Sequence, residues 1–98
     1  MTKGIKLIND ERDRQIHVEG YDEKHDFQHT ADQLICAAVA YLHASNEPMA
    51  IGYWPFDDES WKPKDMKSNL IKAGALVAAA LDRMLLEEEF EGWYEKDC

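Results

Sequence analysis

The chain has 98 residues, of which 45% are apolar, and carries a formal net charge of -9. This length predicts one domain over 1–98 with a modest core. Double-stranded nucleic acid is excluded as an expected partner, because binding it requires a basic face that neutralises phosphates. The longest apolar run is too short to span a membrane and the first residues contain no apolar signal core, so we expect a cytoplasmic protein.

The two cysteines do not predict a metal site. Cys36 lies in an apolar stretch and Cys98 is the last residue. A zinc site needs ligands paired at short spacing, and His25 and His29 have no evident third and fourth ligand nearby. We therefore expect neither a metal nor a cofactor.

The apolar pattern predicts an all-α protein with a three-helix core and a long loop rich in tryptophan and proline. The helices are expected at about 8–19, 30–44 and 66–90, with the loop over 45–65. An acidic C-terminal tail is expected at about 91–98. The expected caps are Asn9 or Asp10 for the first helix, Thr30 for the second and Asp65 or Ser68 for the third, with Gly20 and Gly92 as helix stops.

The second and third predicted helices are apolar around most of their circumference. Such helices must be covered on several sides, and three helices offer few sides. We therefore expect a homo-oligomer, most simply a symmetric dimer that completes a bundle. The alternative is that the tryptophan-rich loop covers the surplus within one chain.

One stripe of the first predicted helix is unusually polar for an inward face. At 100° per residue, Ile8, Arg12, Gln15 and Glu19 share this stripe. Buried polar groups are costly unless they are paired or face a ligand. The stripe therefore predicts a binding site; the alternative is that its polar residues pair with each other or flank the core with their charged ends in solvent.

The connection between the first two helices is rich in charge. His25, Asp26 and His29 suit donation to a phosphate or a ring edge, with the carboxylate fixing an imidazole tautomer. The alternative is that Asp26 caps a helical turn and His29 is solvated.

The aromatic loop ends beside a group of cations. Trp61 is followed by Lys62 and Lys64, and Lys72 comes soon after. Aromatic rings that stack on a base, next to amines that hold a phosphate, suit a nucleotide-like ligand. The alternative is a hydrophobic lid over the bundle.

Several motifs over 11–83 resemble a family of small proteins encoded by bacteriophages and prophages. In order they are Glu11-Arg12-x-Arg14-Gln15, Glu19-Gly20-Tyr21, His25-Asp26-x-x-His29, Leu34-x-x-Ala37-Ala38-x-x-Tyr41, Trp54-Pro55, Trp61-Lys62-Pro63 and Leu70-Ile71-Lys72-Ala73-Gly74-Ala75-Leu76. The resemblance implies a phage origin, and hence the cytoplasm of an infected or lysogenic bacterium. A looser similarity to the all-α nucleotide pyrophosphohydrolases of the MazG type implies magnesium held by paired carboxylates.

The favoured hypothesis is an accessory protein that captures a nucleotide-like small molecule, by analogy with phage proteins that counter host defence signalling. The expected ligand-binding residues are Arg12, Gln15, Glu19, His25, Asp26, His29, Trp61, Lys62, Lys64 and Lys72. One alternative is a magnesium-dependent pyrophosphohydrolase that uses Glu19, Asp22, Asp26 and Asp32. The other is a module that inhibits a host protein through its acidic tail and aromatic loop. Catalysis stays open, and we favour binding because no residue is marked as a nucleophile.

Overall fold

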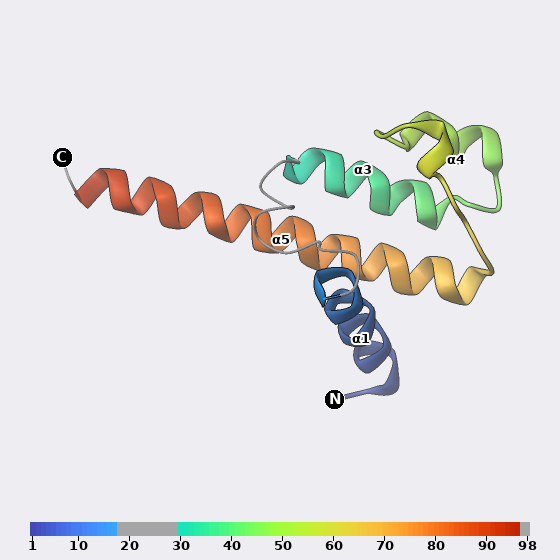
Figure 1. Cartoon of the computed structure of the whole chain (residues 1–98), viewed down its shortest axis with the longest axis horizontal. Coiled ribbons are helices and arrows are strands. Elements are labelled where there is room, and N and C mark those ends of the chain that lie inside the picture. Colours follow the sequence, from blue (N-terminus) through green and yellow to red (C-terminus); the bar gives the residue numbers. More distant parts are fainter. Residues whose placement is uncertain (18–29, 97–98) are drawn as a thin grey trace.

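The structure of the chain is a computed structural model that describes residues 1–17 and 30–96. This part of the chain contains helices and no strand, which confirms the all-α prediction (Figure 1). Its elements are α1 (Lys3–His17), α3 (Ala31–Leu42), α4 (Glu47–Tyr53), the short 3₁₀ turn η1 (Asp58–Ser60) and α5 (Met66–Lys96).

Helix α5 is the axis on which the other elements are arranged. Its 31 residues span about 46 Å at 1.5 Å per residue, close to the longest dimension of the molecule, 49 Å. Helix α3 lies alongside α5 and runs in the opposite direction, while α1 crosses α5 and α4 lies beside α3 (Figure 1). Much of α5 therefore has a packing partner on only part of its circumference.

The predicted start of α3 is correct in detail. The Thr30 hydroxyl accepts from the Gln33 backbone N–H at 3.1 Å, and the Gln33 side chain accepts from the Thr30 N–H at 3.0 Å. This reciprocal pair satisfies two donors that a helix start otherwise leaves unpaired. At the start of α5, Asp65 Oδ1 accepts from Ser68 N at 3.2 Å and so serves as the cap.

Helix α1 begins earlier than predicted, at Lys3 rather than near residue 8. Thr2 Oγ1 lies 3.4 Å from the backbone N of Ile5, and Lys6 forms an ion pair with Asp10 at 3.1 Å one turn later. These local contacts extend the helix toward the N-terminus, so the expected caps at Asn9 or Asp10 are wrong.

The predicted loop over 45–65 contains a helix of its own. Asn46 Oδ1 accepts from Met49 N at 3.4 Å, with Glu47 and Pro48 in the first turn of α4. Ala50 is fully buried. Proline is well tolerated in a first turn, where its missing N–H leaves no bond unmade, so this Pro48 opens a helix rather than excluding one.

Helix α5 also runs past its predicted stop, through Gly92 to Lys96. The helix end at residue 90 and the assignment of 91–96 to a tail are therefore wrong as secondary structure. One glycine inside a helix costs about 1 kcal/mol relative to alanine, which is too little to end a helix without a cap.

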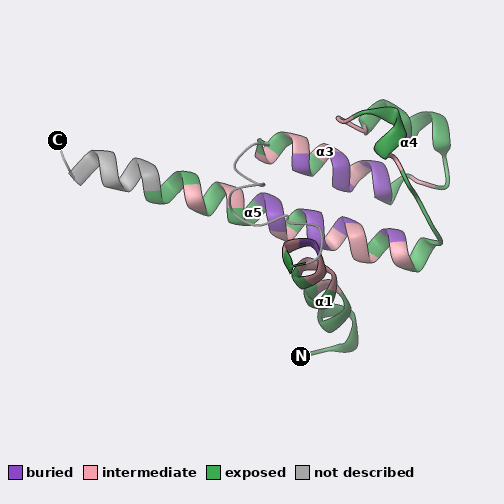
Figure 2. Cartoon of the chain, in the orientation of Figure 1, coloured by how far each residue is buried: buried purple, intermediate pink, exposed green. Residues whose placement is uncertain are grey.

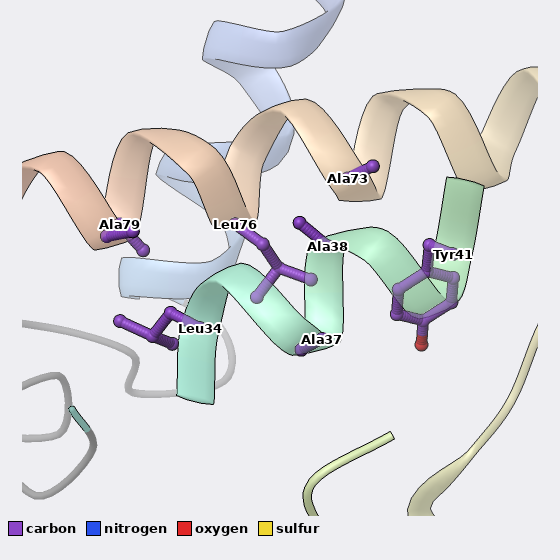
Figure 3. Close-up of a cluster of buried hydrophobic side chains, with 8 residues drawn as sticks. Leu34, Ala37, Ala38, Tyr41, Ala73, Leu76 and Ala79 are labelled. Atoms are coloured by element: carbon purple, nitrogen blue, oxygen red, sulfur yellow. The ribbon is translucent and has the colours of Figure 1, made fainter. Parts of the chain in front are cut away.

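The core is a thin seam of small side chains between α3 and α5 (Figures 2 and 3). It consists of Leu34, Ala37, Ala38 and Tyr41 from α3 with Ala73, Leu76, Ala79 and Ala80 from α5. Alanines let the two helices approach closely but each buries little apolar area, so this seam alone stabilises the fold modestly.

Candidate functional site

The aromatic loop folds inward, onto the end of α3. Trp54 and Trp61 pack against Tyr41 with ring centroids 5.6 and 4.7 Å from it, and lie 5.0 Å from each other. The Trp54 Nε1 donates to the backbone oxygen of Asp57 at 3.0 Å and to Ser60 Oγ at 3.1 Å, which closes the loop on itself. The loop therefore covers the end of the core, in agreement with the alternative of a hydrophobic lid.

Trp61 retains one unused polar group. Its ring is partly buried against the core, and the buried Nε1 has no hydrogen-bond partner among the described residues. A buried N–H without an acceptor is unfavourable by roughly 1–3 kcal/mol. This indole is therefore a donor that a ligand oxygen would satisfy.

The two lysines after Trp61 are exposed, and the backbone around them is fixed from α5. The side chain of Asn69, which is only 4% exposed, accepts from Lys64 N at 2.8 Å and donates to Lys64 O at 2.9 Å. The Asn69 side chain thus satisfies both the N–H and the C=O of the Lys64 backbone. It holds the backbone of Lys64 in place and leaves the amines of Lys62 and Lys64 to solvent.

Lys72 lies between the aromatic loop and α1. Its Nζ is 5.5 Å from the centroid of the Tyr41 ring, a cation–π distance. On α1, the Arg14 guanidinium donates to the Glu11 carboxylate at 2.6 and 2.8 Å and lowers the pKa of Glu11 below its ordinary value of 4.5. Burial opposes this shift, whereas the charge of Lys72 adds to it. Lys72 is therefore engaged by an aromatic ring and by an acid within the chain.

Arg12, one of the predicted ligand-binding residues, already binds an acid of the same chain. Its Nη2 and Nε lie 3.0 and 3.3 Å from Asp82 Oδ2 on α5. The Arg12 side chain is 11% exposed and that of Asp82 is 55% exposed. This pair joins α1 to α5, whereas the structural alternative for the polar stripe expected its residues to pair with each other.

Gln15 is the most buried of the predicted site residues that the structure describes, with 4% of its surface exposed. Its side chain bonds the Glu11 carboxylate and contributes to the lowered pKa of that group. Its Oε1 has no hydrogen-bond partner among the residues that the structure describes. Gln15 and Glu11 are therefore neighbours on α1, and the positive charge of Lys72 on α5 lies near enough to favour the ionised form of Glu11.

Four of the ten predicted ligand residues lie outside the described residues. They are Glu19, His25, Asp26 and His29. Asp22, named for the magnesium alternative, also lies there, and Asp32 is exposed in the first turn of α3. Within 1–17 and 30–96, no three His, Cys, Asp or Glu side chains are placed to share a metal ion.

Sequence reasoning did not locate a second feature, an apolar face shared by α3 and α5. Its exposed members are between 43 and 54% exposed, and Val39 is half-buried. We call this surface the open face; it consists of Ile35, Val39 and Leu42 on α3 and Leu70, Val77, Leu81 and Met84 on α5.

The geometry of two antiparallel helices places these residues on one side. Ile35 directly follows the core residue Leu34, and Val77 directly follows the core residue Leu76. One step along a helix is a rotation of 100° about its axis. Because α3 and α5 run in opposite directions (Figure 1), these two rotations lead to the same side of the pair. The apolar residues of both helices are visible in the sequence, but their position on one side of the pair follows only once α3 and α5 are known to pack antiparallel.

Helix α1 packs on α5 at the edge of the open face. It reaches Asp82 through its arginine, and Ile8 lies against Gly74, where an added Cβ would come 2.6 Å from Ile8 Cδ1. Helix α1 therefore borders the open face at Gly74, while Leu70 and Val77 on either side of that contact stay about half exposed.

No helix in the described part of the chain is long and apolar enough to cross a membrane. Compared with the known protein families, with curated proteins and with solved structures, the chain shows no match.

Proposed function

We propose that this protein acts by binding a protein partner, which packs a helix against the open face. The observation that carries the proposal is the exposure of the open face, where Leu70, Val77 and Leu81 are 49, 48 and 54% exposed along one side of α5. Single exposed apolar residues are normal on protein surfaces, whereas contiguous apolar patches mark interaction sites.

The shape of the open face suits a helix as its ligand. Two helices packed side by side form a shallow groove, and an amphipathic helix buries its apolar stripe in such a groove. The acidic net charge of the chain, -9, disfavours a nucleic acid in this position. This reading retains the hypothesis of a protein-interaction module but assigns its surface to α3 and α5, because the aromatic loop is turned inward.

Methionine oxidation tests the proposal with a control inside the chain. Met84 on the open face and Met49 on α4 are 45 and 44% exposed, so peroxide should oxidise them equally when the face is free. In extract of the producing cell, we expect Met84 to react several-fold more slowly than Met49. Equal reaction of the two residues, both in extract and in concentrated purified protein, would refute use of this face.

Capture of a nucleotide-like small molecule is the second candidate. It is supported by the two buried polar atoms without described partners, Gln15 Oε1 and Trp61 Nε1, and by the exposed amines of Lys62 and Lys64. Under this candidate function, the protein is encoded by a phage and acts against host defence signalling. Its test is calorimetric titration with mono-, di- and cyclic nucleotides.

In that titration, Gln15→Leu should weaken binding at least tenfold, because it removes a desolvated acceptor, while Lys3→Ala should leave binding unchanged. The absence of heat with every nucleotide, together with no small molecule released on denaturation, would exclude this candidate.

A further inference from the structure

We infer that the partner of the open face is a second copy of this chain, with α5 packed antiparallel to α5 about a two-fold axis at Val77. The inference rests on the proposed function and names its partner. A symmetric pair uses the same surface on both subunits, so the surface must be complementary to itself. The apolar side chains and the charges along α5 meet this requirement.

The apolar side chains are placed symmetrically about Val77. Leu70 and Met84 are equally far from it in the sequence, about 10 Å along the helix on either side. In an antiparallel pair centred on Val77, Leu70 of one copy therefore lies opposite Met84 of the other. Leu81 of each copy lies beside Gly74 of the other, next to the position opposite it, and the absence of a side chain at Gly74 leaves room for the leucine.

The charges along α5 are also complementary under this symmetry. The first turn carries Lys67, and the last turn with described side chains carries Glu87 and Glu88, all of them exposed. Lys67 and Glu87 are equally far from Val77, so each end of the antiparallel pair brings a base near acids. Glu87 already forms an ion pair with Arg83 of its own chain at 2.8 Å, which leaves Glu88 as the acid for Lys67 of the other copy. Lys62 and Lys64, which precede the helix, extend the basic end.

A parallel pair would bring like charges together, Lys67 beside Lys67 and Glu88 beside Glu88. It would also align the two helix dipoles in the unfavourable direction. The antiparallel arrangement avoids both. It joins two α3–α5 layers through their open faces, so that the four helices form the bundle that one chain does not complete.

Cysteine cross-linking of the full chain tests the arrangement. In a background with Cys36→Ala and Cys98→Ser, two separately tagged variants, Leu70→Cys and Met84→Cys, are mixed and oxidised. A disulfide requires Cβ atoms about 4 Å apart, so the antiparallel register predicts the mixed 70–84 dimer in at least tenfold excess over either symmetric dimer. Ser45→Cys, exposed and away from the open face, should cross-link only at background level.

Each outcome decides a separate point. A dominant symmetric 70–70 dimer would overturn the antiparallel register while leaving the open face as a binding surface. No cross-link above the Ser45→Cys level, with a monomer mass at every concentration, would overturn the second copy as the partner. In that case Met84 protection in cell extract would still support a different protein partner, and its absence would remove the proposed function as well.

Discussion

Replacement of Gly74 by alanine tests how closely α1 packs on α5. The added Cβ would lie 2.6 Å from Ile8 Cδ1, 2.8 Å from Cγ1 and 3.3 Å from Cγ2, so both branches of Ile8 are in the way. Overpacking of this kind costs about 1–3 kcal/mol. Alanine is favoured over glycine inside a helix by about 0.5–1 kcal/mol. We therefore expect a net loss of about 1 kcal/mol, which lowers Tm by roughly 4–8 °C in a chain of this size.

Gly52 provides a matched control, because it is also in a helix but its added Cβ would meet nothing within 4 Å. Gly52→Ala should therefore stabilise the chain by about 0.5–1 kcal/mol. In an Ile8→Ala background the clash at Gly74 is absent, and Gly74→Ala should become stabilising too. The assay is thermal unfolding by circular dichroism at one protein concentration. A gain in Tm for Gly74→Ala in the unmodified background would refute the close packing of α1.

Three further predictions concern ionic and polar contacts. Glu11 has a folded-state pKa below 4.5, so its contribution to stability is present above pH 4.5 and is lost as the pH falls through the folded pKa. Glu11→Gln should therefore flatten the dependence of Tm on pH below pH 4.5. An unchanged slope in the variant would contradict this prediction. Asn69→Ala should lower the free energy of unfolding in urea by roughly 1–3 kcal/mol, because it removes two partly buried hydrogen bonds to the backbone of Lys64; an unchanged midpoint would show that these two bonds do not stabilise the fold. Lys67→Glu should weaken self-association, measured by sedimentation, about 2- to 30-fold, because each of the two symmetric ion pairs contributes about 0.2–1 kcal/mol. Adding Glu88→Lys should restore the association. A loss that the second change does not reverse would count against the charge pairing.

The helices that local chemistry specifies were the ones predicted best. The starts of α3 and α5 are encoded within four residues, by Thr30 with Gln33 and by Asp65 with Ser68. Helix α4 also begins with a cap residue, Asn46, and has Pro48 in its first turn. The prediction of a loop there is wrong because proline favours irregular structure only outside the first turn of a helix. The end of α5 was misplaced because Gly92 alone is too weak a stop.

The candidate site depended on contacts that local patterns do not contain. Arg12 and Gln15 of the predicted polar stripe are largely buried, but whether Arg12 binds a ligand or another helix depends on Asp82, which is far along the chain from it. Trp61 was expected to stack on a base, and its ring lies against Tyr41 instead. The surplus of apolar surface was visible in the sequence, whereas its position on one side of α3 and α5 followed only from their antiparallel packing.

Sedimentation velocity of the unmodified chain over a dilution series tests the central claim, that the open face joins two copies. The monomer has a mass of 11.3 kDa. We predict a species of twice that mass which dissociates on dilution. At concentrations where the unmodified chain is paired, Val77→Asp should be a monomer, and its circular dichroism should show that its helices are retained. A single species of monomer mass at every concentration of the unmodified chain would contradict the claim.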